Sequence, residues 1–256
     1  MSSDRHGNLA TVGAAAAIRR DLDAELAALR GAATARLRAL RREYTRRLAS
    51  APAATVVRLA ERLVAAGGIE RRFVASELIN HHRAALASLR ARDLERLGRD
   101  LDSWAAVDTF ACYLAGPAWR QGQVGDALIR RWARSPSRWW RRAALVSTVP
   151  LNSRARGASE ARGTSEVRGT SEVRGDARRT LATCRLLLED RDDMVVKAMS
   201  RALRELAKRD PKAARSFVAA HRGALAPRVV REVGNKLATG LKNPRRRRRP
   251  EASRGT

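Results

Sequence analysis

Aromatic residues are scarce in this chain and make up only 4% of its 256 residues. The hydrophobic fraction of 44% therefore consists mainly of alanine, leucine and valine. Alanine and leucine favour helices, whereas sheets draw on β-branched and aromatic residues. The composition thus predicts an all-α fold with enough apolar mass for a core.

Cysteine and histidine are also rare, with two and four residues. Cys112 and Cys184 lie far apart in apolar segments, so we expect buried free thiols rather than a disulfide. The scattered histidines and the two cysteines do not form a metal-ligand spacing. The sequence therefore predicts no metal site and no small-molecule cofactor.

Long apolar runs are missing as well. No stretch approaches the roughly 18 apolar residues that a membrane-spanning helix needs. Residues 1–7 are polar, and the apolar stretch 14–18 is too short for the core of a signal peptide. We therefore expect a cytoplasmic protein that does not insert into a membrane.

Acidic residues are outnumbered: the chain has 26 Asp and Glu against 53 Lys and Arg, which gives a formal net charge of +27. Such an excess indicates a polyanionic partner, and nucleic acid is the simplest one. An anionic membrane surface is the competing partner at this stage.

Apolar residues recur at helical spacing through most of the chain. Gly67-Gly68 and Gly116-Pro117 are typical helix ends. Paired helices with short links, about every 40 residues, indicate an α-solenoid of helical repeats. The helices are expected over residues 14–50 with a break near Gly31, and over 55–66, 70–80, 83–97, 103–114, 124–133, 135–149, 178–189, 193–208, 211–221 and 227–241.

The pattern divides the chain into a helical-repeat domain over residues 14–241, a disordered N-terminus over 1–13 and a basic disordered tail over 242–256. The tail contains five consecutive arginines at 245–249. An insertion over 153–177 holds three Arg-Gly-x-Ser-Glu-x hexads, at 156–161, 162–167 and 168–173. Because the hexads are polar and rich in glycine, we expect a flexible surface segment.

Trp104 and Asp108 stand out as candidate site residues. They are four residues apart and share one side of a helix for which Ser103 is a plausible N-cap. A carboxylate beside a bound polyanion is an unusual placement, and chemistry is one reason for it. An ordinary aspartate paired with an arginine is the alternative.

A second group, Trp139-Trp140-Arg141-Arg142, follows about one helical hairpin later. Adjacent helical residues point about 100° apart, so only one of the two arginines should face a ligand. Tryptophans in this context are either core residues or part of a surface that stacks bases and binds phosphate.

A basic stripe accompanies an apolar one in the helix expected over 193–208. The apolar stripe predicts the buried side of that helix. The basic stripe is either a solvated face or a face that follows DNA phosphates. The apolar residues are Val195, Met199, Ala202 and Leu206, and the basic ones are Lys197, Arg201, Arg204 and Lys208.

In these and further short segments, the chain resembles the AlkD-like DNA alkylation repair family, which is built of HEAT-like repeats. The resemblance covers roughly residues 54–241 without the insertion. It implies a right-handed α-solenoid whose concave, basic cleft grips double-stranded DNA, acting as a monomer associated with the nucleoid. The segments that carry it are 77–79, 103–110, 118–120, 139–145, 195–206 and 231–237.

The resemblance also implies an activity, base excision by a DNA glycosylase that removes cationic alkylated purines of the 3-methyladenine and 7-methylguanine types. Asp108 would stabilise the positive charge that develops on the deoxyribose. Trp104 would pack against the sugar-phosphate backbone. Arg142 would bind a phosphate beside the lesion, as the second arginine of the family's Trp-x-Arg-Arg motif, with Arg141 next to it.

Arg201 departs from the family pattern because it stands where tryptophan is usual. Together with Lys197 and Arg204 it would still contact DNA. A cation near a developing cation should slow excision, so the alternative function is a HEAT-like protein that binds DNA structures without catalysis. A solenoid that binds other proteins is a third class, which the basic residues disfavour.

Overall fold

The structure is a computed structural model that describes residues 17–29, 31, 33–153 and 175–244. The expected hexads at 156–173, the arginine run at 245–249 and residues 1–13 lie outside these ranges. The described residues are helical and contain no strand. The predicted all-α repeat fold is therefore confirmed, while the handedness of the solenoid and its basic cleft stay predictions.

A first helix covers residues 17–28. The others follow with short links. They are α2 (Thr34–Arg47), α3 (Ala53–Ala65), α4 (Ile69–Asn80), α5 (Arg83–Ser88), α6 (Ala91–Leu97), α7 (Trp104–Phe110), the π-helical turn η1 (Ala111–Ala115), α8 (Gly116–Arg120), α9 (Asp126–Ala133), α10 (Arg138–Val146), α11 (Val149–Asn152), α12 (Ala177–Arg185), α13 (Asp193–Ala207), α14 (Pro211–Ala220) and α15 (Pro227–Thr239).

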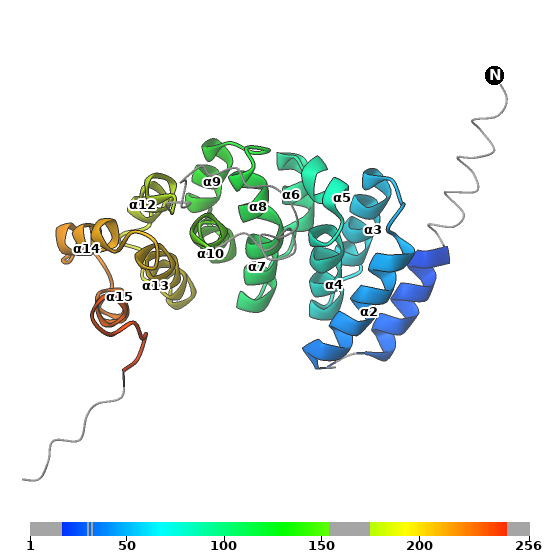
Figure 1. The fold of residues 1–256 in the computed structure, drawn as a ribbon, viewed down its shortest axis with the longest axis horizontal. Coiled ribbons are helices and arrows are strands. Elements are labelled where there is room, and N and C mark those ends of the chain that lie inside the picture. Colours follow the sequence, from blue (N-terminus) through cyan, green and yellow to red (C-terminus); the bar gives the residue numbers. More distant parts are fainter. Residues whose placement is uncertain (1–16, 30, 32, 154–174, 245–256) are drawn as a thin grey trace, which may run out of the picture.

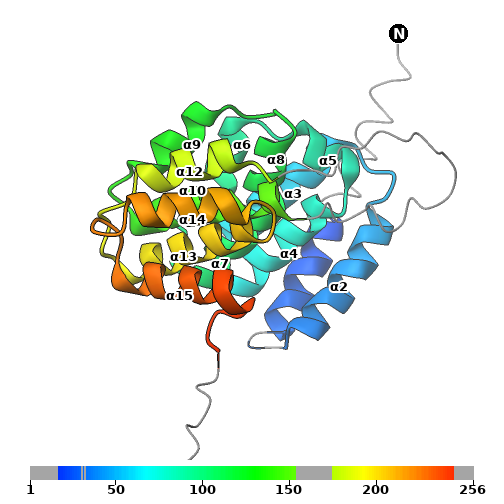
Figure 2. The same ribbon diagram turned by 60° about the vertical axis from the view of Figure 1, so that its left-hand side comes forward.

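The helices stack in two rows. Contacts join α2, α4, α7, α10, α13 and α15 in succession, and we call this the lower row after its place in Figure 1. The helices α3, α5, α6, α9, α12 and α14 form the upper row and pack on the lower one. Figure 2 shows the same stack with its C-terminal helices α13, α14 and α15 brought forward. Apart from η1, α8 and α11, the elements from α2 to α15 thus fall into these two rows.

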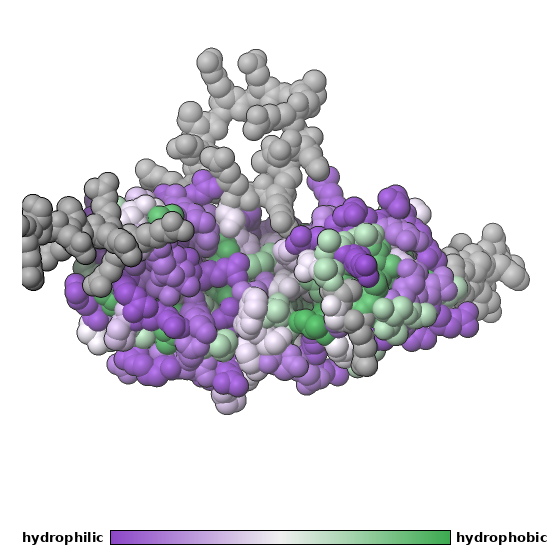
Figure 3. Space-filling model, turned by 90° about the horizontal axis from the view of Figure 1, so that it is seen from below, coloured by the Kyte–Doolittle hydropathy of each residue, from purple (hydrophilic) through white to green (hydrophobic). Residues whose placement is uncertain are grey.

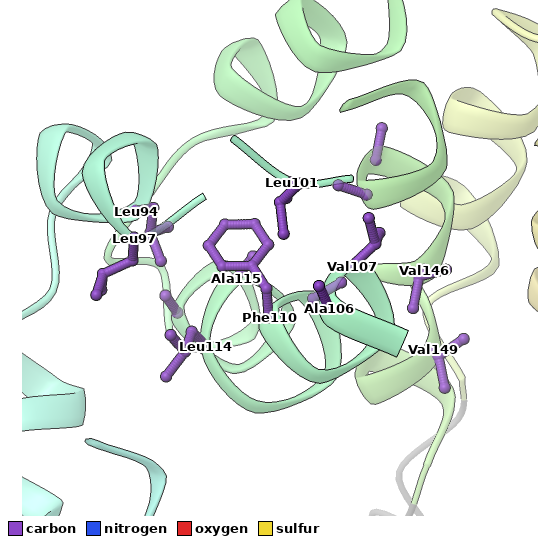
Figure 4. Close-up of a cluster of buried hydrophobic side chains, with 14 of the residues drawn as sticks. Leu94, Leu97, Leu101, Ala106, Val107, Phe110, Leu114, Ala115, Val146 and Val149 are labelled. Carbon is purple, nitrogen blue, oxygen red and sulfur yellow. The ribbon is translucent and has the colours of Figure 1, made fainter. Parts of the chain in front are cut away.

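A hydrophobic core runs through the interface between the rows. Small and branched side chains dominate it, as the composition predicts, and Figure 4 shows one section in which Leu94, Leu101 and Val107 surround Phe110. Seen from below, most of the face that the lower row presents is covered by hydrophilic side chains (Figure 3). Among the helices of the described residues, none is both long and apolar enough to cross a bilayer.

Gly116-Pro117 does not end a helix, so that prediction was wrong. Helical backbone continues from α7 through η1 into α8, with Pro117 in the first turn of α8. Proline is tolerated in the first turn of a helix because the N–H that it lacks would have no acceptor within that helix, and its fixed φ suits the helical backbone. Gly116 is required for a different reason: a Cβ there would lie 2.6 Å from Pro150 Cγ and 2.7 Å from the Ser147 carbonyl oxygen.

Two further boundaries differ from expectation. The helix expected over 83–97 is broken at Leu89-Arg90, where the Asp93 carboxylate accepts a hydrogen bond from the Arg90 amide and starts α6. The helix expected from Ser135 begins at Arg138 instead. There the Ser135 hydroxyl accepts a hydrogen bond from the Ser137 amide. In both places a side chain satisfies a backbone donor and resets the helix start by a few residues.

Candidate functional site

Asp108 lies on α7 in the lower row and is held by two arginines from the next two helices of that row. Its Oδ1 accepts hydrogen bonds from Arg142 Nη2 at 2.8 Å and from Arg142 Nε at 3.0 Å. Its Oδ2 accepts one from Arg201 Nη1 at 2.5 Å. The side chain of Asp108 is 17% exposed, so the carboxylate lies at the surface end of a mostly enclosed ion-pair cluster. We call Asp108, Arg142 and Arg201 the carboxylate clamp.

Arg142 forms the buried side of the clamp. It lies on α10 and is only 5% exposed. Its Nη1 donates to the Met194 carbonyl oxygen at 2.6 Å, at the start of α13. Three of its N–H groups are thus used inside the protein, and the residue links α7, α10 and α13. This geometry fixes the orientation of the Asp108 carboxylate.

Arg201 forms the outer side of the clamp. It lies on α13, and its side chain is 34% exposed. Its Nη2 also reaches Cys112 Sγ at 3.5 Å. Burial raises the pKa of the Cys112 thiol to about 11 although the Arg201 cation favours the thiolate. Arg201 is therefore the member of the clamp that solvent, or a ligand, can reach.

Trp104 stands in the open at the start of α7, one helical turn before Asp108. It is 59% exposed, which is unusual for so large a hydrophobic side chain. The Ser103 hydroxyl accepts a hydrogen bond from the Ala106 amide at 3.4 Å and caps the helix, as predicted. An exposed indole and a fixed carboxylate thus lie on one side of one helix.

Arg141 points away from the clamp. Its Nε donates to Asp190 Oδ2 at 2.7 Å, and its Nη1 donates to the carbonyl oxygens of Ser135 and Pro136. The structure therefore separates the two arginines, as the 100° offset between neighbouring helical residues predicts. Arg141 holds the turn before α10, whereas Arg142 holds Asp108.

Lys197 and Arg204 flank Arg201 along α13. Lys197 pairs with Asp193 at 2.6 Å. Arg204 donates to the Ser200 hydroxyl at 3.2 Å and lies 4.0 Å from Glu232. The predicted apolar stripe of this helix is buried. The basic stripe exists as a row of cations, each with an acidic neighbour, and only Arg201 in it joins the clamp.

Sequence reasoning missed two contributors. Cys112 is four residues after Asp108, so its position on the same helical side was a usable signal. The Met194 carbonyl oxygen offered no signal, because a backbone acceptor has no sequence signature. No group of three or more His, Cys, Asp or Glu side chains suited to a metal ion occurs among the residues that the structure describes. Both cysteines are free thiols, as expected, and Cys184 is buried, but Cys112 is only partly buried.

Fold and site together define a class: a helical-repeat protein with a fixed carboxylate and an exposed indole in a strongly basic chain. A family model described as DNA alkylation repair enzyme matches residues 7–237. The chain belongs to this family, and its role is in DNA alkylation repair. Comparisons with curated proteins and with solved structures give no match.

Proposed function

We propose that this protein is a DNA glycosylase that excises cationic alkylated purines, of the 3-methyladenine and 7-methylguanine types, from double-stranded DNA. The observation that carries the proposal is the carboxylate clamp beside exposed Trp104 in a member of the alkylation repair family. A carboxylate whose orientation is fixed in advance can stabilise a charge that appears only in the transition state.

The chemistry matches the groups present. A purine alkylated on a ring nitrogen is already cationic, so the N-glycosidic bond can break with its electron pair going to the base, which leaves neutral. No general acid is required. The positive charge then resides on the deoxyribose, where Asp108 would stabilise it. Water adds to the sugar carbon and loses a proton, which Asp108 or solvent accepts.

The clamp assigns different roles to the two arginines. Arg142 is a positioning residue, because its N–H groups already bind Asp108 and Met194. Arg201 occupies the oxygen of Asp108 that a substrate sugar would approach, and it is partly exposed. A DNA phosphate is an alternative acceptor for Arg201, and guanidinium groups bind phosphate well. DNA binding would thus release Asp108 Oδ2 while Arg142 keeps Oδ1 in place.

Trp104, Lys197 and Arg204 would extend this surface along the DNA. The exposed indole of Trp104 can pack against the sugar-phosphate backbone. Lys197 and Arg204 flank Arg201 on α13 at helical spacing, so the three can contact successive phosphates. The site would then take duplex DNA without a partner chain, in line with a monomer.

A second function is favoured by one specific contact, the ion pair between Arg201 and Asp108. If Arg201 stays on Asp108 when DNA binds, it neutralises the carboxylate and adds a cation near the developing one. The protein would then bind DNA structures without excising bases.

The test is release of free base from methylated duplex DNA by the wild type, Asp108→Asn and Arg201→Trp. Asp21→Asn is the matched control, because Asp21 is also paired with an arginine but lies in the N-terminal helix. We expect the wild type and Asp21→Asn to release methylated purines, and Asp108→Asn to be slower by about 10²-fold or more. DNA affinity, measured across salt concentrations, should be retained by Asp108→Asn and Asp21→Asn, whereas Arg201→Trp should bind DNA more weakly because it loses a phosphate contact.

Two results separate the functions. Equal excision by Asp108→Asn would remove Asp108 from the mechanism. No excision by the wild type with DNA binding intact would establish the non-catalytic function, and a gain of excision in Arg201→Trp would then assign the loss to Arg201.

A further inference from the structure

A pocket of 720 Å³ lies between α6, α9 and the start of α10. It is separate from the carboxylate clamp, and its lining includes none of the clamp residues. Two of these helices, α6 and α9, belong to the upper row in Figure 1, whereas α10 belongs to the lower row. Its volume is in the range of small-molecule sites. The proposed excision reaction makes no use of it.

Aromatic rings form one wall of this pocket. Trp132 and Trp140 both line it, with ring centroids 4.8 Å apart. Phe110 packs against both rings from the core side, at 5.8 and 5.9 Å. Gly98 is needed for this arrangement, because a Cβ there would lie 2.4 Å from Trp140 Cη2. The wall is thus a braced aromatic surface in which Trp140 is only half-buried.

The indole nitrogen of Trp132 adds an unsatisfied donor to this wall. It is buried and has no hydrogen-bond partner among the described residues. Buried donors are nearly always paired in folded proteins, and an unpaired one calls for an explanation. Because this nitrogen is shielded from solvent, a bound molecule could accept its hydrogen bond only if the Trp132 ring shifts.

Arginines line the open side. Arg130 lies on α9 and Arg134 directly follows that helix, four residues further on. Both are exposed, and neither side chain has a polar or ionic partner in the described part of the chain. Arg131 differs because it is paired with Glu95 across the pocket. Two unpaired guanidinium groups beside an aromatic wall can bind a ligand that joins a flat ring to an anionic group: the ring packs on the wall and the anion binds the arginines.

The turn at Ser135-Pro136 closes the pocket and is held in place from below. Arg141 donates to the Ser135 carbonyl oxygen at 3.1 Å and to the Pro136 carbonyl oxygen at 2.8 Å. Asp190 in turn holds Arg141 at 2.7 Å. A partly buried ion pair thus fixes the edge of the pocket before any ligand arrives.

We propose that this pocket binds a nucleobase together with its phosphate, either as a free nucleotide or as a nucleotide of single-stranded nucleic acid. The base stacks on the Trp140 wall, and the phosphate binds Arg130 and Arg134. Aromatic stacking combined with arginine is how proteins hold single nucleotides without sequence preference. The chemistry of the pocket, rather than the net charge of the chain, sets the ligand class.

The experiment follows the indole N–H signals of the ¹⁵N-labelled full chain by NMR during titrations at physiological salt. The probes are adenosine monophosphate, a single-stranded oligonucleotide, adenosine, inorganic phosphate and a glutamate-rich peptide. We expect adenosine monophosphate or the oligonucleotide to shift the Trp132 and Trp140 signals, with Trp119 unmoved. Whichever of the two binds more tightly identifies the source of the nucleotide. Adenosine and phosphate alone should bind at least about ten-fold more weakly, because each makes half of the contacts.

A pair of variants keeps general charge effects apart from the pocket. Arg130→Gln/Arg134→Gln should weaken nucleotide binding by about ten-fold or more. The control Arg215→Gln/Arg222→Gln removes two equally exposed arginines at α14 and should change it by less than about two-fold. Equal weakening by both pairs, equal binding of the peptide, or no localised shift with either nucleotide probe would overturn the proposal.

Discussion

The carboxylate clamp predicts that loss of Asp108 and loss of Arg201 have very different effects on stability, although the two residues form one ion pair. Asp108→Ala leaves the guanidinium of Arg142, which is 5% exposed, with the Met194 carbonyl oxygen as its only acceptor. Removing one partner of a buried ion pair costs about 3–5 kcal/mol, because the remaining charge stays buried without compensation. Arg201→Ala removes a guanidinium that is 34% exposed and leaves the Asp108–Arg142 pair intact. Its cost should be about 0–1 kcal/mol.

Thermal unfolding followed by circular dichroism at pH 7 measures both variants. For a chain of this size, about 1 kcal/mol lowers the melting temperature by roughly 2–4 °C, so Asp108→Ala should melt about 6–20 °C below the wild type. Asp108→Asn should fall in between, since its amide oxygen still accepts from Arg142. The double variant Asp108→Ala/Arg142→Met should recover part of the loss, because the unpaired charge is gone. Equal costs for the Asp108 and Arg201 single variants would refute this account of the clamp.

Three further outcomes follow from the packing and the titrating groups. Gly98→Ala should destabilise the protein by about 1–3 kcal/mol in thermal unfolding, because its new methyl group meets Trp140 at 2.4 Å; an unchanged melting temperature would mean that this contact relaxes freely. Burial opposes ionisation of Glu232, but hydrogen bonds and nearby cations outweigh it and lower its pKa below 4.5. Its contribution to stability is thus present above about pH 4.5 and lost as the pH falls through the lower folded-state pKa, so a Glu232→Gln variant should show a flatter acid limb of stability against pH. Burial raises the pKa of Cys112 to about 11 and that of Cys184 to about 12, so a thiol reagent at pH 7.5 should react slowly with the native protein and rapidly after unfolding.

Local features of the site could be predicted from the sequence. Ser103 has the side chain of an N-cap, and the four-residue spacing places Trp104 and Asp108 on one side of α7. The 100° offset separates Arg141 from Arg142. Each of these inferences needs only helical geometry over a few residues.

Long-range pairing could not be predicted in the same way. Arg201 lies 93 residues from Asp108 in the sequence, and Arg142 lies 34 residues from it. Nothing in the residue types says which of many arginines meets this carboxylate, because the choice depends on how α7, α10 and α13 stack. The predicted helix end at Gly116-Pro117 was wrong for a related reason. Local propensity favours a helix end there, but packing of Gly116 against Pro150 holds the backbone helical.

Helix α10 connects the two sites, because the side chains of three of its consecutive residues point in three directions. Trp140 enters the aromatic wall of the pocket, Arg141 fixes the turn before α10, and Arg142 fixes Asp108. A shift of α10 along its axis would therefore move the pocket wall and the carboxylate together. Ion pairs brace both ends of this link, so a ligand that moves α10 from one site would also act on the other. If both proposed ligands bind, a thermodynamic cycle should show each changing the affinity for the other by the same factor.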